Sequence, residues 1–264
     1  MADQVGQGGG QGGMDVGTEP PPLGVFARPD VVPYITRWSS ERILPAVVLA
    51  DDRGIRYADE LPHDRDARGI LWKRVGLSPG KGRPVFGDVH FLRQRRAMRK
   101  LLCQVCGGPA DRTEDGTLWL VGEDADDRET WSAEFITGHP PLCVPCAVTS
   151  VRACPHLRER YVALRVRTFE LGGVQGALYR LHGRLPVAYS ADGVPFDSWR
   201  VHWVLAGQLI MRLRAYTLVD LAAEHAAYVR RTARPMTGGP GPFPGSPCGP
   251  DEGPRRAMRP GGRW

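Results

Sequence analysis

Two Cys-x-x-Cys pairs constrain what this chain can fold into more than any other feature of the sequence. The pairs are Cys103 with Cys106, and Cys143 with Cys146. Zinc binds four sulfur or nitrogen ligands in a tetrahedron, and a tight turn carrying two cysteines three positions apart supplies two of them. Glycines after the second cysteine of the first pair allow backbone amides to approach the sulfur atoms. We therefore expect one structural Zn²⁺ held by all four thiolates.

The residues around the second pair predict a helix that begins at these cysteines. Pro145 suits a first helical turn, and thiolates near a helix N-terminus are stabilised by the helix dipole. Between the pairs, residues 117–121 predict a strand, and residues 130–136 predict its hairpin partner. A knuckle, a hairpin and a helix in this order resemble the treble-clef zinc domains over roughly residues 100–156. That resemblance implies a treble-clef-like fold around the metal.

Both ends of the 264-residue chain have biased composition. Residues 1–24 are rich in Gly, Gln and Pro, and residues 234–264 are rich in Gly, Pro and Arg. Neither segment can bury enough apolar surface to offset the entropy lost on ordering. We expect two disordered tails around a folded core, 25–233, that contains a zinc-binding subdomain at 100–156. The expected fold class is α+β, with small mixed strands and helices around the zinc site.

The sequence also predicts a compartment. The first residues lack a charged segment followed by an apolar run, so we expect no signal peptide. No stretch has the apolar length of a membrane span. Four of the six cysteines have zinc spacing, and reduced thiols persist in a reducing compartment. We therefore expect a cytoplasmic protein with no membrane contact.

Periodicity and turn residues predict the remaining elements. In the first half, residues 42–50 and 55–57 form an expected hairpin, and the glycine-rich stretch 76–82 lacks phosphate-loop spacing, so we interpret it as a turn. In the second half we expect strands at 162–167 and 176–181 joined by a glycine-rich turn. A further strand is expected at 199–207, and a helix at 217–231.

Residues 88–102 predict an amphipathic helix that leads into the first cysteine pair. Its apolar side chains recur at helical spacing, and basic side chains lie opposite or nearby: Arg93, Arg96, Arg99 and Lys100. Such a face can contact a nucleic-acid backbone, although a solvated face is the commoner use. The segment between the cysteine pairs is acidic and would repel phosphates. Any nucleic-acid surface must therefore lie on the flanks, or the acidic segment must face away.

Four stretches together resemble a group of uncharacterised actinomycete proteins with the same two cysteine pairs. The stretches are residues 95–111, 118–120, 139–147 and 150–157, and the resemblance extends from about residue 40 to residue 225. It implies a shared fold and a shared metal site. It implies no activity.

Three classes of function remain after these observations. The first is a zinc-stabilised, non-catalytic protein that binds a nucleic acid or a protein, because four cysteines leave zinc no open position for substrate. The second is a thiol redox or metal sensor, in which Cys154 exchanges into the site. The third is an HNH-like nuclease, which needs a His base and further metal ligands. Only His139 lies between the pairs, and the chain has no Asn. Cys154 and His156 are alternative ligands, and the sequence identifies no small-molecule substrate.

Overall fold

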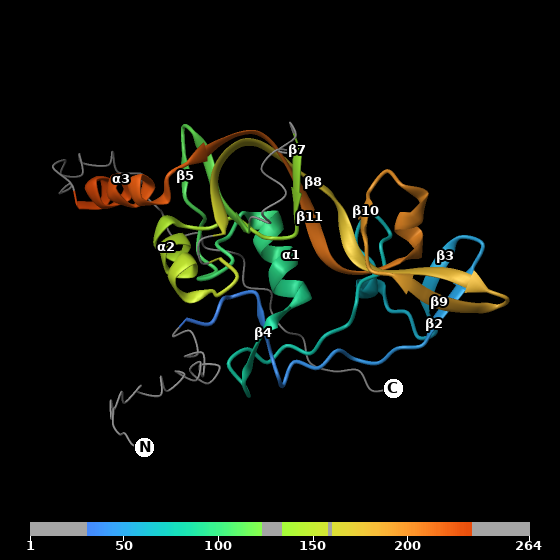
Figure 1. Cartoon of the computed structure of the whole chain (residues 1–264). Helices are drawn as coiled ribbons and strands as arrows, with labels where there is room; N and C mark the ends of the chain where they lie inside the picture. Colours follow the sequence, from blue (N-terminus) through green and yellow to red (C-terminus); the bar gives the residue numbers. More distant parts are fainter. Residues whose placement is uncertain (1–30, 123–133, 158–159, 234–264) are drawn as a thin grey trace, which may run out of the picture.

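The structure is a computed structural model that describes residues 31–122, 134–157 and 160–233. Within these ranges the protein has a mixed α+β fold with three α-helices and antiparallel sheets, which confirms the predicted fold class (Figure 1). None of the helices in this part of the chain combines the length and apolar character that a bilayer crossing requires. The expected tails, 1–24 and 234–264, lie outside the described residues.

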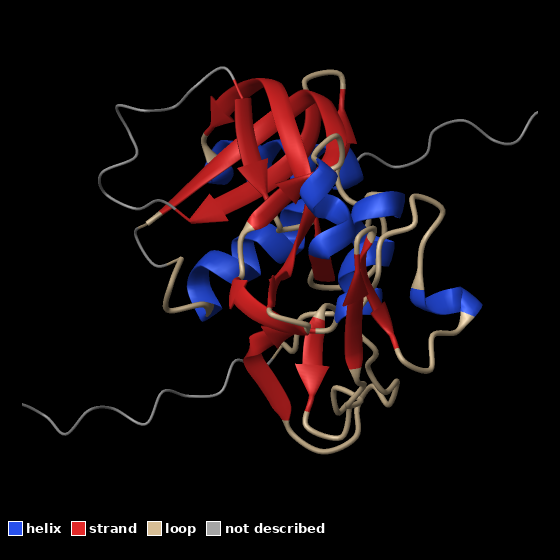
Figure 2. Cartoon of the chain, turned by 90° about the vertical axis from the view of Figure 1, so that its right-hand side faces the viewer, coloured by secondary structure: helices blue, strands red, loops and turns tan. Residues whose placement is uncertain are grey.

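One antiparallel sheet dominates the molecule. Its strand order is β5-β6-β8-β11-β7, and β9 and β10 also pair with β8. Strands β8 and β11 are by far the longest. Both arch over α1 in Figure 1, and Figure 2 shows the strands in red from a view turned by 90°. The strands are β5 (Arg112–Thr113), β6 (Gly116–Gly122), β7 (Glu134–Thr137), β8 (Tyr161–His182), β9 (Leu185–Ser190), β10 (Gly193–Pro195) and β11 (Val204–Val219).

Two small sheets come from the first third of the chain. Strands β1 (Thr36–Trp38) and β4 (Pro84–Val89) form one, and β2 (Val48–Asp51) and β3 (Gly54–Tyr57) form the other. The second pair confirms the hairpin expected between residues 42 and 57. The helical elements are η1 (Pro62–Asp64), α1 (Phe91–Lys100), α2 (Val144–Ala153), η3 (Trp199–Trp203) and α3 (Leu221–Ala233).

The expected break between strands at 162–167 and 176–181 is wrong, because β8 runs without interruption through the glycines. Those glycines allow close approach of backbone rather than a turn. A Cβ on Gly173 would lie 2.3 Å from the carbonyl oxygen of Val194, and one on Gly176 would lie 2.2 Å from that of Leu205. The turn comes later, at Gly183, whose φ of 64° is left-handed. The glycines therefore let β8 curve within a crowded sheet.

Three other element predictions need correction. The expected hairpin partner of residues 117–121 pairs elsewhere, because β7 pairs with β11 and β6 pairs with β5 and β8. The expected strand at 199–207 begins as the short helix η3. The expected helix at 217–231 begins only at Leu221. Asp220 precedes it, and its carboxylate accepts a hydrogen bond from the N–H of Ala223, as an N-terminal cap does.

The main core lies between the curved sheet and α1. It includes Met98 of α1 and Trp119 of β6, with apolar residues of β8 and β11. One buried polar side chain fixes α1 against the sheet. Gln94 donates to the carbonyl oxygens of Gly138 and Leu209, both at 2.8 Å, and accepts from the N–H of Leu209 at 3.0 Å. Because buried amides need such partners, these bonds specify where the helix sits.

Replacing Gly173 with Ala should destabilise the protein, since the new methyl group meets backbone that cannot move freely. We expect the free energy of unfolding to fall by about 1–3 kcal/mol, measured by urea denaturation. Gly87→Ala is the matched control, because nothing lies within 4 Å of its added Cβ. Equal stability of the Gly173 variant and the wild type would contradict the crowding argument.

Candidate metal centre

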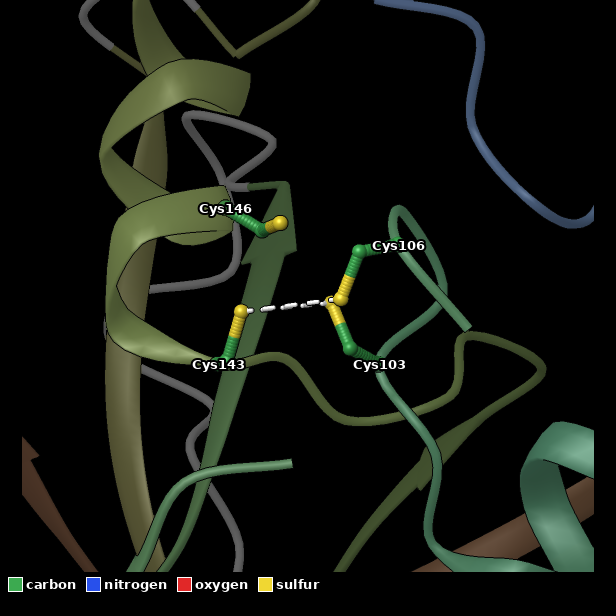
Figure 3. Close-up of side chains that lie close together, drawn as sticks. All are labelled: Cys103, Cys106, Cys143 and Cys146. Atoms are coloured by element: carbon green, nitrogen blue, oxygen red, sulfur yellow. Dashed lines mark hydrogen bonds between the residues drawn. The ribbon is translucent and has the colours of Figure 1, made fainter. Parts of the chain in front are cut away.

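The structure brings the four predicted cysteines together. The sulfur atoms of Cys103, Cys106, Cys143 and Cys146 all lie within 4.8 Å of one another. Cys143 Sγ lies 3.8 Å from Cys103 Sγ and 3.9 Å from Cys106 Sγ (Figure 3). Four sulfurs at about 2.3 Å from a tetrahedral zinc are about 3.8 Å apart. The donor set and its spacing therefore fit a metal ion such as zinc.

The first pair sits in a tight turn directly after α1. The helix ends at Leu101, whose φ of 50° is left-handed and whose N–H bonds to Ala97. Within the turn, the N–H of Gly107 donates to the carbonyl oxygen of Cys103 at 2.9 Å. Gly107 itself has a φ of 72°, and a Cβ there would lie 2.9 Å from the ring of Tyr34. Only glycine meets both demands without strain, which explains its place after the pair.

The second pair lies at the start of α2. Cys143 is the N-cap residue, Pro145 lies in the first turn, and the N–H of Ala147 bonds to the carbonyl oxygen of Cys143 at 3.0 Å. This arrangement confirms the helix predicted after the second pair. The positive end of the helix dipole therefore lies beside two sulfur atoms, where it favours negative charge.

The pKa values of the clustered thiols are shifted because the sulfur atoms lie close to one another. The Cys143 thiol donates a hydrogen bond to Cys103 Sγ, and with nearby backbone N–H groups it lowers the pKa of Cys103 to about 5, although burial opposes this. The hydrogen bond to Cys103 raises the pKa of Cys143, and burial raises the pKa of Cys146 to about 12. One thiolate is thus favoured, while further loss of protons places like charges together. A bound dication would compensate those charges and favour all four thiolates.

The cluster forms one wall of a second hydrophobic core. Cys103 is buried with Leu118, Leu142, Ala163 and Leu221, and the side chains of Cys143 and Cys146 pack against them. Cys106 is the exposed member. The core therefore joins α1's end, β6, α2, β8 and α3 at the sulfur atoms.

The fifth described cysteine lies outside the cluster. Cys154 is the C-cap of α2, and the grouped sulfur atoms do not include it or His156. His139 and His156 instead line a pocket of about 640 Å³ beside β6 and β7. Among the described residues, the four cysteines are the only group of three or more His, Cys, Asp or Glu placed to share a metal ion.

The four basic residues that the sequence grouped on one helix all lie on α1, but they differ in burial. Arg93 does not belong to an exposed basic face of the helix. Its side chain is buried, and its Nη1 and Nη2 donate to the two carboxylate oxygens of Glu41, each at 2.7 Å. Nη2 also donates to the carbonyl oxygen of Thr36 at 2.7 Å. Arg93 therefore attaches α1 to the segment that carries Thr36 and Glu41, and its guanidinium group does not lie on the surface.

The other three basic residues of the predicted group are exposed: Arg96, Arg99 and Lys100. Arg99 Nη2 lies 3.4 Å from a carboxylate oxygen of Asp66. The neighbouring Arg95 stacks its guanidinium group 3.7 Å from the ring centroid of Trp72. The exposed part of this helix is thus basic and linked to the loop that carries Asp66.

Comparisons with protein-family models, with curated proteins and with solved structures found no match. The structure itself shows the class of site: a four-cysteine cluster, in a mixed α+β fold, that can hold a metal ion. The resemblance to the actinomycete group stays a resemblance.

Replacing Arg93 with Ala should cost about 3–5 kcal/mol of unfolding free energy, because it leaves Glu41 charged, buried and unpaired. Arg96→Ala on the same helix is the matched control, and we expect a change within about 0.5 kcal/mol. Chemical denaturation at pH 7 measures both. Equal effects of the two substitutions would contradict the buried pair.

The same pair predicts a pH dependence. Burial alone would raise the pKa of Glu41, but hydrogen bonds from Arg93 and from the N–H groups of Trp38 and Ser78 lower it to about 2. Its charged form therefore stabilises the fold above the unfolded-state pKa, about 4.3, and this contribution is lost as pH falls towards 2. We expect the stability of the wild type to fall more steeply than that of Glu41→Gln between these values. Parallel curves would exclude Glu41 as the cause.

Proposed function

We propose that this protein is a zinc-stabilised, non-catalytic binding protein in which Cys103, Cys106, Cys143 and Cys146 hold one structural Zn²⁺. The observation that carries the proposal is the mutual distance of the four sulfur atoms, which suits a tetrahedral ion. Four protein ligands complete that tetrahedron, so the site keeps no position for water or substrate. A metal in such a site contributes folding free energy rather than chemistry.

The arrangement of elements supports a treble-clef-like unit around the metal. The first cysteine turn is followed by the β5–β6 hairpin, and the second pair begins α2. The hairpin differs from the expected one, but the order of turn, hairpin and helix is the same. The proposed unit, residues 100–156, also contributes β6 and β7 to the main sheet, so it is anchored to the rest of the core.

A thiol redox or metal sensor is the second candidate, and the exposure of Cys106 favours it. An oxidant can reach this sulfur from solvent, and its oxidation would remove one ligand. The two candidates share the metal site and differ in whether the metal stays bound under oxidising conditions.

Native mass spectrometry with metal analysis should find one zinc per chain in the wild type. Cys103→Ser and Cys143→Ser should each lose the zinc and much of the folding free energy, because three ligands hold the ion weakly. The matched control is Cys154→Ser, which removes a cysteine outside the cluster and should keep one zinc.

Zinc-free wild-type protein, or zinc that survives both ligand substitutions, would exclude the structural metal. The same measurement after mild peroxide treatment separates the two candidates. Retained zinc supports the structural role, and release of zinc with reversible loss of fold supports the sensor.

A further inference from the structure

Strand β9 lies at the opposite end of the sheet from α2 and α3 (Figure 1). Two aromatic rings, one on β9 and one on η3, are exposed. Trp199 of η3 is 74% exposed and Tyr189 of β9 is 45% exposed. Arginines hold the second ring in place: Arg200 Nη2 donates to the hydroxyl oxygen of Tyr189 at 3.1 Å, and the guanidinium carbon of Arg180 lies 5.2 Å from its ring centroid. The Tyr189 ring and the two guanidinium groups therefore form one assembled surface, and Trp199 directly precedes Arg200 in the chain.

Contacts between side chains connect the exposed part of α1 to the segment that precedes η3. Arg99 pairs with Asp66, and Arg68 in the same loop stacks its guanidinium carbon 4.4 Å from the ring centroid of Phe196. Phe196 precedes Trp199 by three residues. Exposed or half-exposed arginines thus occur on α1, on this loop, on η3 and near the end of β8. We name as the basic track Arg96, Arg99, Arg68, Arg200 and Arg180, with the rings of Trp199 and Tyr189 at its end.

We propose that the basic track binds single-stranded nucleic acid, an inference that rests on the proposed binding function and names its partner. Exposed rings stack on unpaired bases, and arginines along a surface neutralise successive phosphates. In a duplex the faces of the bases are stacked on one another, so the rings of Trp199 and Tyr189 could not stack on them. The net charge of +6 favours a polyanion as well.

One feature of the same region limits the alternatives. Pro186 lies in β9, and a proline in a short edge strand disfavours pairing with an added strand. Asp192 and Asp197 are exposed and lie within three residues of the rings in sequence, and their carboxylates would repel phosphates as well as an acidic peptide. The five arginines of the basic track outnumber these two carboxylates.

The test measures fluorescence anisotropy of labelled 20-nucleotide oligo(dT) and oligo(U), and of a 20-base-pair duplex, with the full zinc-loaded chain. We expect both single strands to bind more tightly than the duplex, with affinity that falls as salt rises. Trp199→Ala should weaken single-strand binding at least about fivefold, and Trp199→Phe should retain most of it. Phe86→Ala, which removes an exposed ring outside the track, should leave binding unchanged.

Charge reversal tests the arginines. The double variant Arg68→Glu and Arg200→Glu should weaken binding and reduce the salt slope, whereas Arg167→Glu, an exposed arginine of β8 outside the track, should do neither. Arginines of the C-terminal tail could attract any polyanion, but such attraction would not depend on Trp199.

Three results would overturn the proposal: no single-strand binding, tighter duplex binding, or binding that ignores both Trp199 and the charge reversal. An acidic peptide, poly-glutamate, that competes fully with oligo(dT) would also overturn it, since bases would then be irrelevant. Zinc content is measured in each sample. Zinc-loaded protein that fails to bind refutes only the nucleic-acid surface, while zinc-free protein refutes the metal proposal.

Discussion

Four sulfur atoms meet where the end of α1, the loop before α2 and the start of α2 converge. The apolar side chains around them form a smaller core than the main one, and Cys103 is itself among its buried members. Thiols alone would bring protons or like charges into that space. A cation among the sulfurs would instead convert a crowded cluster into four bonds, and the small core would then depend on those bonds more than on any other contact.

Buried ion pairs attach the surrounding segments to this framework. Arg165 of β8 is fully buried and lies 2.7 Å from a carboxylate oxygen of Asp111 and 2.5 Å from one of Glu224 on α3. The ion pair of Glu41 and Arg93 likewise attaches the segment before β2 to α1. Such pairs add little net stability compared with apolar contacts, but losing one partner is costly. They therefore specify which segments dock where.

The sequence could predict what depends on local spacing and could not predict what depends on distant partners. The cysteine pairs, the helix before them and the helix after them follow from local pattern, and the structure confirms their positions. The burial of Arg93 depends on Glu41, which lies 52 residues earlier. The position of β7 depends on β11, and the glycines of β8 are explained only by the strands that cross them. Trp199 was expected to begin a strand, but it begins η3 and its ring is exposed.

Strand β8 contributes to every part of the interior. Ala163 belongs to the core at the cysteines, Val174 and Leu178 belong to the main core, and Ala177 and Tyr179 pack on the cluster beneath β2 and β3. No seam therefore divides the described chain into independent pieces. A shortened version that keeps the cysteines but ends before this strand would lose the surface against which they are ordered.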